Sequence, residues 1–109
     1  TIRQCIFKNN SSEDALNIIR SNFIIYNSIF HNNLNDALDI DFCKGEIQKS
    51  IFIQSGNDAI DCSGSNIKIT ETSITRAFDK GISAGENTKI VGNNIKIHDS
   101  NIYEGCEKA

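Results

Sequence analysis

Residues 36–40 read Asp-Ala-Leu-Asp-Ile, and this stretch decides the fold because it recurs along the chain at a fixed interval. Asp-Ala-Leu-Asn-Ile stands at 14–18, Asp-Ala-Ile-Asp-Cys at 58–62, and a weaker copy, Lys-Gly-Ile-Ser-Ala, at 80–84. Each copy begins 22 residues after the previous one, at positions 14, 36, 58 and 80. A fixed period of this length indicates a repeat architecture in which each unit stacks on its neighbours.

Apolar and polar residues alternate within each repeat, as in Leu38-Asp39-Ile40, and this is the period of a strand with one buried face. A unit of this length holds about three short strands and returns to its start one strand spacing, roughly 4.8 Å, along the stack. The sequence therefore predicts an all-β fold, a right-handed parallel β-helix (solenoid) of about five coils. Leucine-rich repeats and two-helix repeats have comparable periods, but their Leu and Ala patterns are missing here.

Stacking places equivalent residues in columns, and the apolar columns are the predicted core. These columns are Leu16, Leu38, Ile60 and Ile82; Ile18, Ile40, Cys62 and Ala84; Ile25, Ile47, Ile69 and Val91; and, after a one-residue insertion in the first loop, Phe7, Phe30, Phe52 and Ile74. Burying one such aliphatic side chain stabilises the fold by roughly 1.5 to 3 kcal/mol. Cys5 falls into a further column of small residues with Ser28, Ser50 and Thr72.

The whole chain, 1–109, is predicted to be a single β-helix domain. We expect it to be an excerpt of a longer chain, because neither end carries a cap for the open strand edges. Residues 94–97, Asn-Ile-Lys-Ile, echo residues 66–69 at a step of 28 rather than 22. This echo predicts an irregular region from about residue 86 onward, with an inserted loop at 86–93.

Composition and charge narrow the possible partners. The net charge of -3 and the scattered Lys and Arg residues leave no basic stripe, which argues against nucleic-acid binding. No apolar run approaches the about 18 residues of a membrane span. Stacked coils offer a long, regular surface, so the partners we expect are an extended polysaccharide, a protein, or neighbouring coils and domains of the parent chain.

Aspartates concentrate on one predicted face of the coils. Asp39 and Asp61 alternate with inward residues, so they point outward one coil apart, and Asn17 and Ser83 continue their column. Like charges in register are unfavourable, and a site that tolerates them often binds a cation or holds a protonated carboxyl. Four more aspartates join this patch, namely Asp14, Asp36, Asp41 and Asp58. We interpret the patch as a sugar or calcium site, or else as a solvated face of turn-capping aspartates; no other cofactor is expected.

The cysteines and histidines offer no catalytic set. The spacings of Cys5, Cys43, Cys62 and Cys106 match no zinc or redox motif. Cys62 replaces an isoleucine in an inward column, so we interpret it as a buried structural thiol. The two histidines, His31 and His98, lack a matching acid or nucleophile column, and no hydrolase triad can be assembled.

The coil at residues 56–69, Gly-Asn-Asp-Ala-Ile-Asp-Cys-Ser-Gly-Ser-Asn-Ile-Lys-Ile, resembles the parallel β-helix repeats of pectate lyase-like proteins. The resemblance covers nearly the whole chain. More narrowly, the motifs at 36–39, 56–61 and 80–83 are similar to β-helix segments found beside spore-coat-H-like domains in bacterial surface proteins. These resemblances imply an exported bacterial protein located outside the cell or on its surface.

Polygalacturonases of this fold carry Asn-Thr-Asp, Gly-Asp-Asp and Gly-His-Gly motifs on successive coils, and the match here is partial. Asp36 and Asp58 align with acids of the first two motifs, so the resemblance implies that they are the candidate catalytic pair. However, Asn57 replaces an aspartate, the histidine of the third motif is missing at 79–81, and the family's Arg-x-Lys motif has no counterpart.

Three functional hypotheses follow. The first is a noncatalytic structural β-helix segment that contacts a glycan or protein partner, because the core columns are complete and the catalytic set is not. The second is a polysaccharide hydrolase or lyase that uses the outward acidic residues. The third is a calcium-stabilised, adhesin-like module. In the first and third cases, Asp39, Asp61, Asp41, Asn17 and Ser83 are the predicted binding residues.

Overall fold

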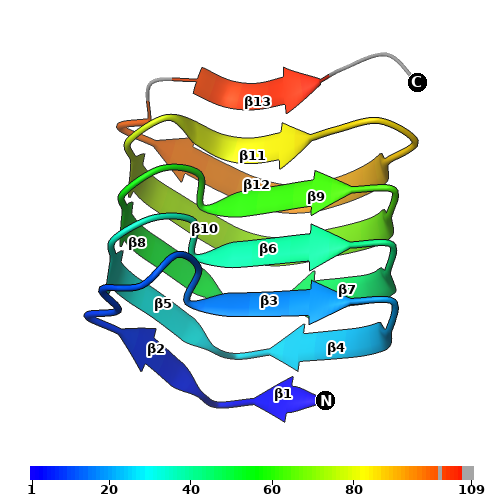
Figure 1. Ribbon diagram of the computed structural model, residues 1–109, viewed down its shortest axis with the longest axis horizontal. Coiled ribbons are helices and arrows are strands. Elements are labelled where there is room, and N and C mark those ends of the chain that lie inside the picture. Colours follow the sequence, from blue (N-terminus) through cyan, green and yellow to red (C-terminus); the bar gives the residue numbers. More distant parts are fainter. Residues whose placement is uncertain (101, 107–109) are drawn as a thin grey trace.

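The computed structural model describes residues 1–100 together with the backbone of residues 102–106. Every regular element in this part of the chain is a β-strand, and the strands stack in parallel as a solenoid of about four turns, slightly fewer than the sequence suggested. In Figure 1 the front strands run to the right, the rear strands run back, and the chain climbs from bottom to top, so the solenoid is right-handed. The predicted fold class is confirmed. The described residues contain no helix that could span a membrane.

The strands form three rows that follow one another around each coil. The first row contains β1 (Ile2–Arg3), β4 (Asn22–Tyr26) and β7 (Lys44–Gln48). The second row contains β2 (Ile6–Lys8), β5 (Ile29–Asn33) and β8 (Ile51–Ser55). The long strands β10 (Asn66–Ala77) and β12 (Lys89–His98) run through both rows, because β10 pairs with β7 and β8, and β12 pairs with β10 along nearly its whole length. The third row contains β3 (Leu16–Ile19), β6 (Leu38–Asp41), β9 (Ile60–Ser63), β11 (Lys80–Ala84) and β13 (Ile102–Cys106).

Strand pairing confirms most of the predicted columns. Leu16, Leu38, Ile60 and Ile82 are direct partners in the third row, and so are Ile18, Ile40, Cys62 and Ala84. Ile2 extends the column of Ile25, Ile47 and Ile69. The rings of Phe7, Phe30 and Phe52 stack with centroids 4.8 and 4.5 Å apart. The solenoid interior is therefore a set of continuous apolar columns, and the one-residue insertion before Phe30 is also confirmed.

The prediction for the last coil was wrong. Ile69 pairs with Gly92 rather than with Val91, which lies outside the core with half of its surface exposed. The inserted loop at 86–93 is also absent, because β12 begins at Lys89 and stacks on β10 throughout. One extra residue at the corner near Asn87 changes the step from 22 to 23. A one-residue shift sends every following side chain to the opposite face, and this explains the misplaced Val91. The loop was predicted from the echo of residues 66–69 at 94–97, but Ile95 stacks on Thr72 and not on Ile67.

Three columns of corner residues turn the chain, and nearly all of them have left-handed backbone conformations without being glycine. The columns are Gln4, Asn27, Lys49, Glu71 and Asn94; Asn9, Asn32, Gln54, Arg76 and Asp99; and Arg20, Phe42, Gly64 and Asn87. Only Gly64 is a glycine, and a Cβ atom there would lie 2.6 Å from the ring of Phe42. The repeated corner conformation fixes where each strand ends and the next begins.

A column of hydroxyl groups follows the corner between the first and second rows. Ser28, Ser50 and Thr72 are almost fully buried, as is typical of a core position. The Ser50 hydroxyl accepts the backbone N–H of Ser28 (3.2 Å) and donates to the carbonyl of Gln48 (2.9 Å). We call these three residues the hydroxyl column. Cys5 lies at the lower end of this column, as the sequence predicted, and its backbone N–H donates to the Ser28 hydroxyl.

The structure describes three cysteine side chains, and two of them, Cys43 and Cys62, are buried. Cys5, Cys43 and Cys62 are unpaired, and Cys62 is completely buried in its apolar column. Burial raises the pKa of the Cys62 thiol far above its ordinary value, so it is not a nucleophile. The interpretation of Cys62 as a buried packing residue is confirmed, whereas the side chain of Cys106 lies outside the described residues.

Candidate functional site

The candidate site is a group of aspartates on and beside the third row of strands. One column in the turn before each strand supplies three of them, the column of Asp39 and Asp61 on the strands supplies two, and Asp41 lies two residues further along β6. We call Asp14, Asp36, Asp39, Asp41, Asp58 and Asp61 the acidic face.

Two residues of the turn column, Asp36 and Asp58, each hold the next coil through a carboxylate oxygen. Asp36 Oδ1 accepts the backbone N–H of Asp58 (3.0 Å) and the side-chain amide of Asn57 (2.9 Å). Asp58 Oδ1 in turn accepts the backbone N–H of Lys80 (3.1 Å). Both aspartates are buried, with 8% and 5% of their surface exposed. Their side chains therefore satisfy backbone donors that the turn leaves without a strand partner.

The strand column lies as the sequence predicted. Asp39 pairs directly with Asp61, and Asn17 and Ser83 occupy the neighbouring positions below and above. Asn17 Nδ2 donates to the carbonyl of Asp39 (3.0 Å) and to Asp41 Oδ2 (3.3 Å). All five predicted binding residues thus lie on one face of the third row.

Crowding of these carboxyls changes their acidity. Burial, followed by the charges of Asp41, Asp14 and Asp61, raises the pKa of Asp39 from 3.8 to about 7. Burial, followed by the charges of Asp36 and Asp58, raises the pKa of Asp61 to about 6. The pKa values of Asp14 and Asp58 are also raised, mainly by burial. Burial destabilises the charged form of a carboxyl because it removes water, and a neighbouring negative charge destabilises that form further, so both raise the pKa.

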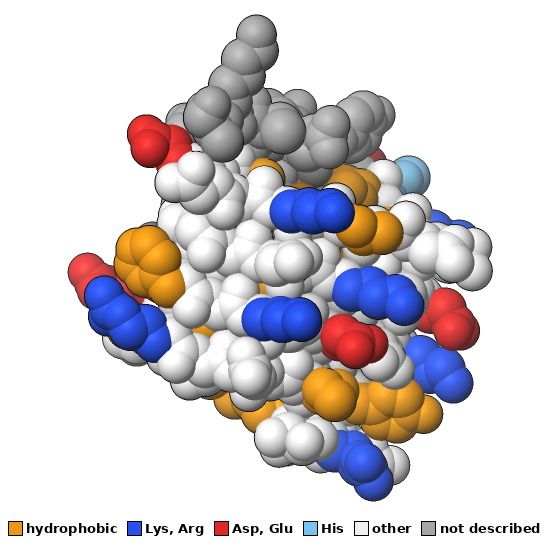
Figure 2. All heavy atoms as spheres, turned by 90° about the vertical axis from the view of Figure 1, so that its right-hand side faces the viewer, with side chains coloured by type: hydrophobic (Ala, Val, Ile, Leu, Met, Phe, Trp, Pro, Cys, Tyr) orange, Lys and Arg blue, Asp and Glu red, His pale blue; other side chains and the backbone are white. Residues whose placement is uncertain are grey.

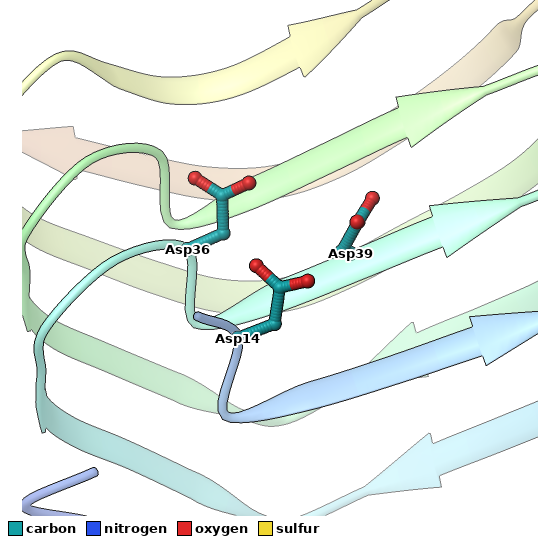
Figure 3. A group of neighbouring side chains, drawn as sticks. All are labelled: Asp14, Asp36 and Asp39. Carbon is teal, nitrogen blue, oxygen red and sulfur yellow. The ribbon is translucent and has the colours of Figure 1, made fainter. Parts of the chain in front are cut away.

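Two groups of three carboxylates converge on this face. Asp14, Asp36 and Asp39 form one group, in which the two turn residues lie beside the strand residue (Figure 3). Asp36, Asp58 and Asp61 form the other, and in each group one oxygen per residue lies within 4.8 Å of the others. Two oxygens bound to opposite sides of one calcium ion lie roughly 4.6 to 5.2 Å apart, so this spacing is compatible with a divalent cation. Three carboxylates alone do not supply the about six to eight oxygens that calcium prefers.

Asp36 and Asp58, the predicted catalytic pair, are brought together by the fold. Their oxygens lie within 4.8 Å, closer than the roughly 6.5 to 9.5 Å that separates the carboxyls of inverting glycosidases. Each also holds a backbone N–H of the next coil. A catalytic role for this pair stays a prediction that the geometry does not favour.

Sequence reasoning missed that the turn aspartates connect the coils. The signal was present, because an aspartate recurs at the same turn position in three successive repeats. Lys80 occupies the next place in this turn column, as the step of 22 predicted, and its backbone N–H donates to Asp58. The Nζ atom of Lys80 lies 3.3 Å from Asp79 Oδ2, and that hydrogen bond is the main cause of the raised pKa of Lys80.

Comparisons with known proteins add no relative. No protein-family model, curated protein or solved structure matches this chain. The resemblance to pectate lyase-like repeats therefore depends on the motifs of this chain, and the functional argument depends on its own residues.

Proposed function

We propose that this chain is a noncatalytic structural β-helix segment of an exported bacterial protein, which contacts a glycan or protein partner through its outer faces. The observation that carries the proposal is that Asp36 and Asp58 accept backbone N–H groups from neighbouring coils. A general acid or base must exchange its proton with the substrate, and a buried carboxylate that holds the backbone is poorly suited to that task. The partial match to the polygalacturonase motifs also supports a noncatalytic role, because residues 79–81 lack the histidine of the third motif.

An activity assay tests this proposal. The purified chain is incubated with a panel of acidic and neutral polysaccharides, and reducing ends and unsaturated products are measured. We expect no turnover above background. Turnover that is lost in Asp58→Asn but retained in Asp79→Asn, a nearby carboxylate outside both three-carboxylate groups, would instead establish the hydrolase or lyase alternative.

A calcium-stabilised module is the second candidate. It is favoured by the two carboxylate groups that share Asp36, because a cation between them would relieve the repulsion that raises the pKa of Asp39 and Asp61. A hollow of about 360 Å³ lies beside the turn column, and the side chains of Glu13 and Asn35, which line it, could supply further oxygen ligands.

Melting curves with calcium, magnesium and chelator test this candidate. A ligand present at about 100 times its Kd stabilises the fold by about 2.7 kcal/mol, which is a shift of many degrees for a domain of this size. We expect calcium to raise the Tm of the wild-type chain and to have no effect on Asp39→Asn combined with Asp61→Asn. An unchanged Tm of the wild-type chain in calcium would exclude this candidate and leave the scaffold proposal as it stands.

A further inference from the structure

Lysines gather on a second face of the solenoid, around the corner from the acidic face. Lys44 lies on β7, Lys68 on β10 and Lys89 on β12, and all three side chains are exposed. Figure 2 shows basic side chains spread across the middle of this face. Lys44 and Lys89 flank Asn66 in one column, and Lys68 lies beside Glu46 in the next. We call these three residues the lysine face.

The lysine face forms no ion pair within the described part of the chain, although Glu46 lies beside Lys68 and offsets part of its charge. Ion pairs in the described part of the chain join Lys80 to Asp79 and His98 to Asp99, and neither involves this face. Glu46, its acidic neighbour, accepts a hydrogen bond from Gln48 Nε2 (2.8 Å). The lysine face therefore carries a positive charge on a molecule whose net charge is -3.

A hollow of about 510 Å³ lies beside Lys44 and Lys68, two residues of the lysine face. Its polar wall also includes Glu46, Asn22 and Asn66, so two ammonium groups face one carboxylate there, and Phe23 and Gly45 line its apolar part. A Cβ atom at Gly45 would lie 2.5 Å from the ring of Phe23, so glycine is what lets the ring cover this strand. The surface is thus recessed and positive, and a projecting acidic partner would fit it.

We propose that the lysine face docks the acidic face of a second copy of this chain. Both faces belong to the same coils, so their charged groups rise with the same strand spacing of roughly 4.8 Å. Two solenoids that pack side by side with parallel axes can therefore pair carboxylates with lysines over several coils at once. A partner with another spacing would align at one pair only.

Electrostatics supports this choice of partner. Asp39 and Asp61 repel each other within one copy, and ammonium groups from a neighbour would relieve that repulsion. The two surfaces are different, so the contact is head-to-tail and leaves one free face of each kind at the ends of an assembly. The inference deepens the proposed scaffold function by naming a partner, and it rests on that function because a scaffold uses its outer faces for contacts.

Sedimentation velocity over a range of protein and salt concentrations tests the proposal. We expect the average mass to rise with protein concentration at about 20 mM salt and to fall to that of the monomer at about 1 M, where the Debye length is only about 3 Å. Combining Lys44→Glu, Lys68→Glu and Lys89→Glu should lower the association constant at least about tenfold. The control combines Lys8→Glu, Arg76→Glu and Lys96→Glu, which make the same change of charge at exposed positions elsewhere and should associate more strongly than the first variant.

A mixing experiment makes the test sharper. The variant with three glutamates keeps its acidic face, and Asp39→Asn with Asp61→Asn keeps its lysine face. We expect each variant alone to be a monomer and an equimolar mixture to form heterodimers, with circular dichroism showing that both are folded. A wild-type chain that stays monomeric at low salt, or one whose association survives 1 M salt, would overturn the proposal. Polysaccharide turnover would remove the scaffold function without altering these masses, so the two failures are distinguishable.

Discussion

The hydroxyl column and the turn aspartates both accept backbone N–H groups from adjacent coils, but one does so with neutral hydroxyls and the other with charged carboxylates. Ser50 and Asp36 each accept a backbone N–H from an adjacent coil, at 3.2 and 3.0 Å. The hydroxyl is neutral and can be stacked without electrostatic cost, whereas each added carboxylate raises the pKa of its neighbours. A hydroxyl satisfies the backbone equally well, so the hydrogen bond alone does not require a charged residue at the turn position.

Breaking the hydroxyl column should have the largest effect. Ser50→Ala leaves the N–H of Ser28 buried without an acceptor, which costs about 1 to 3 kcal/mol. Urea denaturation of the variant measures this loss. Ser73→Ala, on the outward side of β10, is the matched control and should change stability by less than about 0.5 kcal/mol. Equal losses in the two variants would contradict the role of the hydroxyl column.

Two substitutions at Asp36 separate its hydrogen bonds from its charge. Asp36→Ala removes the acceptor for two donors and should destabilise the fold by about 1 to 2 kcal/mol. Asp36→Asn keeps an acceptor oxygen and removes the charge, so we expect its stability to equal or exceed that of the wild-type chain. If the asparagine variant were as unstable as the alanine variant, the charge itself would be required for folding.

The pH dependence of stability should expose the repulsion within the acidic face. Asp39 has a pKa of about 7 in the folded chain against an ordinary value of 3.8, so between these values the folded state binds more protons than the unfolded state. The contribution of Asp39 to the free energy of unfolding is therefore fully present below about pH 4, and it is lost as the pH rises through 7. After allowance for solvent screening of this half-exposed group, we expect a loss of roughly 1 kcal/mol.

Thermal melts at pH 5 and pH 8 check this dependence. The wild-type Tm should fall between the two values, and the fall should become smaller in Asp39→Asn combined with Asp61→Asn. A wild-type Tm that rises over this range, with the variant behaving identically, would contradict the predicted repulsion.

The smallest effect should come from the ion pair at the edge of the acidic face. Lys80 Nζ and Asp79 Oδ2 are 3.3 Å apart and partly exposed, so screening leaves them little net attraction. Asp79→Asn should change the free energy of unfolding by less than about 0.5 kcal/mol in urea denaturation. A loss comparable to that of Ser50→Ala would show that this exposed pair stabilises the fold as much as the hydroxyl column does and would contradict the expected screening.

Local pattern was enough to predict the apolar columns and the outward column of Asp39 and Asp61. A strand alternates faces strictly, so once the step of 22 is known, the direction and stacking partner of each residue follow. The small-residue column of Cys5 and Ser50 followed from the same counting. The sequence by itself thus determined the repeat, the row of each strand and most of the residues of the candidate site.

Only the tertiary structure decided the last coil, the bonding of the turn aspartates and the second charged face. A single extra residue at a corner leaves the apolar alternation intact, so counting could not reveal that Gly92 and not Val91 stacks on Ile69. A turn carboxylate can point to solvent or to the next coil. Packing of the next coil places its backbone N–H within reach, so the carboxylate of Asp36 points to that coil. Charges distant in the sequence become one surface only when the coils stack, because their separation in space is set by strand spacing and not by chain length.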